Sequence, residues 1–255
     1  MPVIALTRAT ALSLLRNGFS RFLFILACFF MAGALLMLSF DIGVRYRLLE
    51  NTLLASQCFL LHLFAWSFGF DVLKKNTAEK LYVLPFSTSL SARSWLLGRF
   101  SGAAILVVGM GLLFLLVDTV LFAALKIDIF SVLMLQVLLY VASACLSLAV
   151  IFFLSCFLDV LSALIYGVVL WIIGHGLDEL LLLTDQQFEP AVQILVQCFY
   201  YLLPNFSFFD ISSQALNRLP IETEKLVFIL TYPLIYIVVL LDIGAAIFSR
   251  KPIGQ

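Results

Sequence analysis

The residue types that most often carry chemistry are few in this sequence, and they are scattered. The two histidines, His62 and His175, lie far apart in apolar runs, and the five cysteines lack the C-x-x-C spacing of redox and metal motifs. Neither G-x-x-x-x-G-K-[ST] nor H-E-x-x-H occurs, so the sequence holds neither a nucleotide-binding P-loop nor a zinc-protease helix. We therefore predict no catalytic centre, cofactor or metal site in this chain.

Two acids, Asp118 and Asp242, lie inside long apolar runs, each toward one end of its run. That position favours an acid that caps or pairs near a membrane boundary over a proton relay, which needs several acids at the midplane. Neutral polar residues in these runs either line a pathway or bond helix to helix, and the second use is the more frequent. These residues are Gln57, His62, Gln136, Tyr140, Ser143 and Ser147.

The composition indicates that lipid surrounds most of these groups. Hydrophobic residues make up 64% of the 255 residues and charged residues only 12%, whereas soluble domains carry about 25% charged residues. So few charges cannot cover a water-facing surface. The net charge is zero, which argues against a nucleic-acid partner.

Six apolar runs are long enough to cross a bilayer as helices, which takes roughly 20 residues. They are continuous and do not alternate with a period of two, so helices are favoured over barrel strands. The predicted fold is an all-α integral membrane protein with a single domain over residues 1–255. The predicted spans are 22–40, 52–70, 101–124, 130–157, 160–183 and 226–248.

The distribution of Lys and Arg sets the orientation of these spans. With six spans, ten basic residues fall on the side of the two termini and five on the other side. Both termini are therefore predicted to be cytoplasmic.

Two further helices are expected outside the spans. Residues 3–17 mix apolar residues with Thr, Arg and Ser and predict a helix at the cytoplasmic interface. In the long outer loop, a helix is expected to begin at Pro190 and to stop near Pro204, and to dip into or pack on the outer boundary. The same loop and the end of the fifth span carry acids that favour a solvated rim over a cation-attracting mouth. These acids are Asp178, Glu179, Asp185 and Glu189.

The segment 71–100 between the second and third spans is polar and holds seven of the 30 charged residues. Asn76 is a candidate cap for a short helix over Thr77–Val83, with Glu79 as its reciprocal partner and Pro85 as its end. Such a protruding helix suits docking to a soluble partner, and a solvated loop held by anionic lipid is about equally compatible with the composition.

The order of residues in this segment resembles the ABC-2 type transporter permeases. That family has a small or polar residue, an acid and an apolar pair, then Pro with Ser or Thr, a basic residue and a "GK" or "GR" that enters the third span. The counterparts here run from Asn76 to Leu81, then Leu84-Pro85-Phe86-Ser87, Arg93 and Leu97–Phe100. Asn76 stands where the family has glycine, and the arginine that usually follows Pro-Phe-Ser is displaced to Arg93.

Two later stretches resemble the multicopper-enzyme-maturation branch of the same family, which includes accessory permeases of nitrous-oxide reductase. "LLPNFSFFDI", residues 202–211, is similar to its outer-loop motif, with Pro204, Asn205, Phe206 and Asp210 as the matching residues. "IFSRKPIGQ", residues 247–255, is similar to its ending, a phenylalanine followed by a basic pair.

The resemblance implies the permease subunit of an ATP-driven exporter in a bacterial inner membrane. The permease would pair with a second copy or a paralogous permease and with two ATPase subunits, which carry the ATP and Mg²⁺. The turn with Cys156 and Asp159 would be a second cytoplasmic contact. The residues implied for ATPase coupling are Lys74, Lys75, Asn76, Thr77, Glu79, Lys80 and Leu81.

Alternatives remain open at this point. Within the family, the haem-exporter permease of cytochrome c maturation has a similar loop, and "LLPNFSFFDI" argues against it. An ion-driven secondary transporter and a membrane scaffold that anchors a soluble partner are the other classes. Neither the substrate nor its route follows from the sequence.

Overall fold

In the computed structural model, every regular element of the described residues is a helix. The described residues are 2–36, 39, 45–78, 91–126, 130–187, 190–212, 214 and 223–249. The prediction of an all-α fold is therefore confirmed for this part of the chain.

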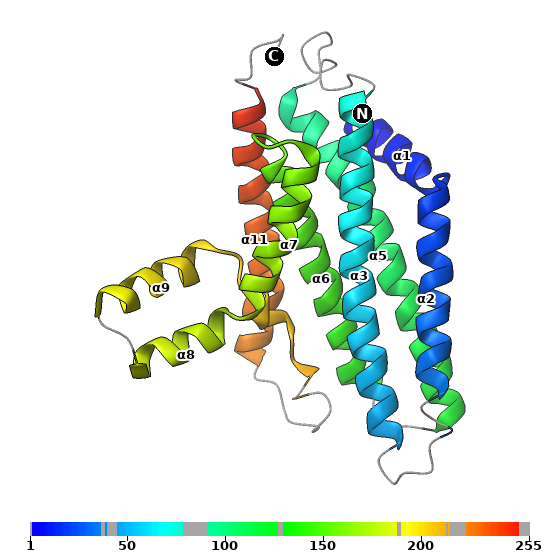
Figure 1. The fold of residues 1–255 in the computed structure, drawn as a ribbon. Helices are drawn as coiled ribbons and strands as arrows, with labels where there is room; N and C mark the ends of the chain where they lie inside the picture. The colour runs from blue at the N-terminus through cyan, green and yellow to red at the C-terminus, as the bar shows by residue number, and fades with distance from the viewer. Residues whose placement is uncertain are drawn as a thin grey trace.

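Five long helices form the bundle: α2 (Gly18–Leu36), α3 (Arg45–Ala78), α5 (Ala92–Leu125), α6 (Phe130–Leu154) and α11 (Thr223–Phe248) (Figure 1). α6 carries no charged residue, and it packs against α3, α5, α11 and α7 (Val160–His175). The side chains of α6 are more deeply buried than those of the other long helices, because other helices surround it.

Among the described residues, four helices are long and apolar enough to cross a membrane, and up to six spans result when each of two bent helix pairs counts as one. The four are α3 over Arg47–Lys75, α5, α6 over Leu133–Leu154 and α11. The first bent pair is α1 (Pro2–Leu15) with α2, which meet at 65°. The predicted helix before the first span is thus present as a separate element.

The second bent pair changes the prediction of one straight span over 160–183. α7 ends at His175, and α8 (Leu177–Gln187) continues at an angle of 50°. Gly176 caps α7, and its N–H bonds back to the carbonyl of Ile173 at 3.0 Å. α9 (Pro190–Leu202) follows, and α8 and α9 together project from the side of the bundle (Figure 1). The expected helix between Pro190 and Pro204 is confirmed.

Figure 1 places α1, the end of α3, the start of α5 and the end of α11 at one end of the bundle. We call this the terminal end, marked by Ala78, Ala92 and Phe248, and the opposite end the distal end, marked by Arg45 and Leu125. α3 runs without a break through Asn76 to Ala78, so Asn76 does not cap a new helix. The ion pair of Asp71 with Lys75, one turn apart at 3.1 Å, supports this last part of α3. The remainder of the predicted helix, residues 79–83, lies outside the described residues.

Candidate functional site

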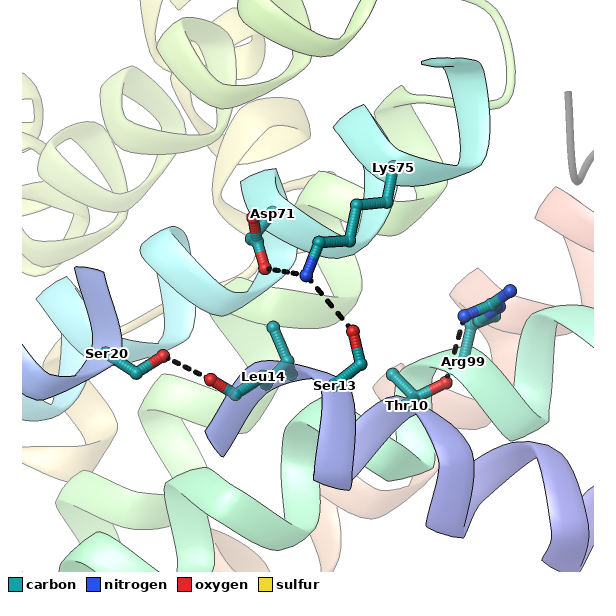
Figure 2. Close-up of polar contacts among 7 residues, drawn as sticks. All are labelled: Thr10, Ser13, Leu14, Ser20, Asp71, Lys75 and Arg99. Atoms are coloured by element: carbon teal, nitrogen blue, oxygen red, sulfur yellow. Dashed lines mark hydrogen bonds and ion pairs between the residues drawn. The ribbon is translucent and has the colours of Figure 1, made fainter. Parts of the chain in front are cut away.

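At the terminal end, polar side chains tie α1 to two other helices. Lys75 on α3 places its Nζ 3.1 Å from Asp71 Oδ2, and the same ammonium donates to the hydroxyl of Ser13 on α1 at 3.1 Å (Figure 2). Arg99 on α5 donates to the hydroxyl of Thr10 at 3.3 Å. We call these five residues the terminal clamp. They hold α1 against the end of α3 and the start of α5. In the sequence, these two helix ends precede and follow the segment 79–90.

Two glycines on α5 let α1 approach closely enough for these contacts. A Cβ placed on Gly98 would lie 2.8 Å from Leu6 Cδ2. A Cβ on Gly102 would lie 2.6 Å from Thr10 Cβ and 2.8 Å from the carbonyl oxygen of Thr7. Helices approach closely where small residues repeat at this spacing of four. The sequence placed Gly98 in a family motif, and the structure gives it a packing role.

The start of α5 is also fastened to the end of α11. Arg93 contacts the Asp242 carboxylate through two nitrogens, with Nε 2.7 Å from Oδ1 and Nη2 2.8 Å from Oδ2. Near this pair in the fold, the Trp95 and Phe248 rings stack with centroids 5.2 Å apart. The structure thus assigns a partner to Arg93, the residue displaced from the family pattern, and the expectation that Asp242 is a paired acid near a helix end is confirmed.

Changing Asp242 to Asn is expected to lower the free energy of unfolding by about 0.5–1 kcal/mol, because this bidentate pair is solvent-exposed. The side chains of Arg93 and Asp242 are 63% and 40% exposed, respectively. Thermal unfolding of the purified protein in detergent measures the change. The charge-swapped pair, Arg93→Asp with Asp242→Arg, should recover most of the loss, and a swap that destabilises as much as both single changes together would contradict a direct interaction.

Only some of the residues implied for ATPase coupling belong to the described part of the chain. Lys74 is exposed, with its Nζ 5.9 Å from the centroid of the Phe70 ring, whereas Lys75 already has its partners within the terminal clamp. Asn76 and Thr77 lie in the last turn of α3, and their side chains are outside the described residues. The remaining three, Glu79, Lys80 and Leu81, are outside the described residues entirely.

The turn between α6 and α7 presents only one of its two candidate contact residues. Cys156 is 2% exposed, and its thiol lies 3.4 Å from the carbonyl of Phe152. Asp159 is exposed and caps α7 by accepting from the N–H groups of Leu161 and Ser162, both at 3.1 Å. Hydrogen bonds from Ser162, through its side chain and its N–H, and from the Leu161 N–H lower the pKa of Asp159. A partner at this turn would therefore meet Asp159 and not the thiol.

The predicted outer-loop motif forms a compact segment inside the distal half of the bundle, residues 203–212, which we call the distal plug. Pro204, Asn205 and Phe206 are buried, and Asp210 is exposed and accepts from the Ser212 N–H at 2.9 Å. The Phe206 N–H donates to the carbonyl of Gly174 at 3.0 Å, where a Cβ on Gly174 would lie 2.5 Å from the Pro204 oxygen.

Side chains from three helices satisfy the plug's polar groups. Asp178 on α8 accepts from Asn205 Nδ2 at 2.9 Å and from the Ser207 hydroxyl. Tyr232 on α11 accepts from the Asn205 N–H at 2.9 Å. Asp178 is half-buried and thus anchors the Asn205 and Ser207 side chains of the plug, which corrects its interpretation as part of a solvated rim. Sequence reasoning could not single it out, because its partner lies 27 residues away.

Gln136 on α6 holds the other half of the distal plug. It is fully buried, its amide donates to the Phe209 carbonyl at 2.8 Å, and its oxygen accepts from the Ile211 N–H at 2.8 Å. Irregular backbone at membrane depth occurs only where protein or a cavity surrounds it. These bonds therefore make the buried, largely non-helical plug possible.

Three other polar residues of the apolar runs, His62, Ser143 and Ser147, form hydrogen bonds between α3 and α6, the use that the sequence favoured. His62 on α3 lies 3.0 Å from the Ser143 hydroxyl through Nε2 and 2.8 Å from the Cys58 carbonyl through Nδ1. A carbonyl only accepts, so neutral His62 carries its proton on Nδ1. Trp66 donates to Ser147 at 2.6 Å. The fold also brings the two histidines together, with ring centroids 6.4 Å apart. Within the described residues, no group of three or more His, Cys, Asp or Glu side chains is arranged to hold a metal ion.

A scan against protein-family models finds no match for this chain, and a search of curated proteins finds none. The family resemblance therefore stays a prediction from the sequence.

Proposed function

We propose that this chain is the membrane-spanning permease subunit of an ATP-driven transporter of the ABC-2 type, acting as an exporter. In this proposal it pairs with a second permease chain and couples to two separate ATPase subunits. The observation that carries the proposal is the segment 71–100. Its residue order resembles that of the family's coupling segment, and it connects α3 to α5 at the terminal end, where α1 and α11 both pack against α5.

The contacts at the terminal end support a mechanical role for this segment. A soluble partner that moves residues 79–90 would displace the end of α3 and the start of α5. The terminal clamp would carry that displacement to α1, and the pair of Arg93 with Asp242 would carry it to α11. Closure of the ATPase subunits would then shift packed helices as rigid bodies, which is how alternating access is commonly produced.

Reversing the charges of the segment, with Glu79→Lys and Lys80→Glu together, is expected to reduce ATPase co-purification at least tenfold, because like charges would face each other across the contact. Pull-down of the tagged chain with a candidate ATPase, chosen as a neighbouring reading frame that carries G-x-x-x-x-G-K-[ST], measures the loss. Glu224→Lys with Lys225→Glu, an exposed pair at the start of α11, is the matched control. If the wild type, the charge-reversed variant and the control bind the ATPase equally, residues 79 and 80 are not part of the coupling contact.

The ion-driven carrier remains the second candidate, because Asp118 is a buried carboxyl inside a predicted span. Transport by the purified chain in liposomes, without any ATPase and driven by an ion gradient, would favour it. Transport that requires both the ATPase and ATP supports the permease.

A further inference from the structure

One buried acid is not explained by the packing of the bundle. Asp118 on α5 is 7% exposed, and both of its carboxyl oxygens lie 2.9 Å from the same atom, Nε2 of Gln57 on α3. Gln57 is fully buried, and its own carbonyl oxygen has no hydrogen-bond partner. The acid therefore faces a neutral amide, with one buried oxygen beside it that lacks a donor.

The surrounding residues offer little to stabilise a negative charge. On α5, Asp118 is flanked one turn away by the buried side chains of Phe114, Leu115 and Phe122. α6, which packs against both α3 and α5, carries no charged residue, and its Tyr140 is buried. A carboxyl that leaves water without a cation or several donors is neutralised more easily than it is ionised.

The charged and titratable groups nearest along the two helices lie away from Asp118. Lys126 follows it on α5 by about 12 Å of helix and is exposed, and Arg99 precedes it by about 28 Å. On α3, Arg47 is exposed and lies about 15 Å from Gln57 along the axis, while Glu50 is a second buried acid at about 10 Å. His62, about 8 Å beyond Gln57, is already bonded to Ser143 and Cys58.

We propose that Asp118 and Gln57 form a buried proton-binding site, in which the Asp118 carboxyl holds a proton at neutral pH. A small turn of the Gln57 amide brings its partnerless oxygen to the acid O–H while its N–H still donates to the other carboxyl oxygen. Acid and amide then satisfy each other without any charge. The site joins α3 and α5, the two helices that precede and follow residues 79–90. While the proton is held, the acid–amide pair keeps α5 packed against α3. This inference does not depend on the proposed transport activity.

Infrared spectroscopy of the full chain in lipid nanodiscs tests the site directly, since a protonated carboxyl has a carbonyl stretch that a carboxylate lacks. At pH 7 the wild-type protein should show this band, and Asp118→Asn should remove it. Gln57→Leu should keep the band but shift it to higher frequency, because the carbonyl loses its amide donor. Asp242→Asn, which changes an acid paired with Arg93, should leave it unchanged. Glu50→Gln identifies any band from the second buried acid.

Several outcomes would overturn the inference. One is a pH 7 spectrum with no band that depends on Asp118. Another is a band whose frequency does not change in Gln57→Leu, and this measurement tests the pair even when Asp118→Asn fails to fold. A third is a carboxylate signal that changes when choline replaces sodium, which would assign the site to a small cation instead of a proton.

Discussion

Replacing Gly102 by leucine is expected to force α1 off the bundle and to lower the free energy of unfolding by about 1–3 kcal/mol, the usual cost of overpacking. Even a Cβ at this position would lie 2.8 Å from the carbonyl oxygen of Thr7, which is backbone and cannot turn aside. It would also lie 2.6 Å from Thr10, whose hydroxyl accepts from Arg99. Thermal unfolding in detergent measures the loss. Tryptic cleavage at Arg16, between α1 and α2, should become faster.

Gly109→Leu is the matched control, because Gly109 lies on the same helix and a Cβ there meets no atom within 4 Å. Both substitutions gain the same helix propensity, roughly 0.8 kcal/mol relative to glycine, so the difference between them isolates the contact with α1. The control should be neutral or slightly stabilising. Similar unfolding midpoints and cleavage rates for the two variants would show that α1 does not rest on Gly102.

Changing Gln136 to leucine is expected to release the distal plug from α6. The substitution leaves the Phe209 carbonyl and the Ile211 N–H without the partners they have at 2.8 Å. Each buried polar group that loses its partner costs about 1–3 kcal/mol, so the total loss is on the order of 2–6 kcal/mol. Hydrogen exchange should rise most at the Ile211 amide, and the unfolding midpoint should fall.

Thr231→Val provides the comparison for this second change. The Thr231 hydroxyl is exposed and donates to the carbonyl of Val227 within its own helix at 2.7 Å, so its loss should cost less than about 0.5 kcal/mol. Exchange at residues 209–212 should stay at the wild-type rate in this control. If Gln136→Leu also leaves that exchange unchanged, the plug is held by its apolar contacts and not by Gln136.

Several features could be predicted because they depend on local patterns. Continuous apolar runs of about 20 residues indicate membrane-crossing helices whatever their neighbours are. Pro190 and Pro204 bounded α9 correctly, because proline is tolerated in the first turn of a helix and cannot continue one. The wrong prediction that Asn76 caps a helix also came from a local pattern. A capping pattern was present in the sequence, but Asp71, Lys75 and Ser13 continue α3 past it.

The candidate sites could be predicted only in part, because their contacts join residues far apart in the chain. Gln57 and Asp118 are 61 residues apart, and Arg93 and Asp242 are 149 apart. Each of these polar residues has more than one plausible partner in the sequence. Burial in the folded bundle selects one of these partners, because a polar group without a partner is costly inside an apolar bundle.

The class of this protein follows from its amino-acid sequence: an all-helical chain, too apolar and too weakly charged for a water-facing surface, with one long polar segment between two apolar runs. Hydropathy, charge and proline positions act residue by residue, so no knowledge of the fold was needed. Three outcomes required the tertiary structure: α1 rests on Gly98 and Gly102, the chain bends at Gly176 between α7 and α8, and Asp178 and Gln136 hold the distal plug. Those outcomes depend on which helix faces meet. Close packing and the pairing of buried polar groups select those faces, and both act between residues that the chain keeps far apart.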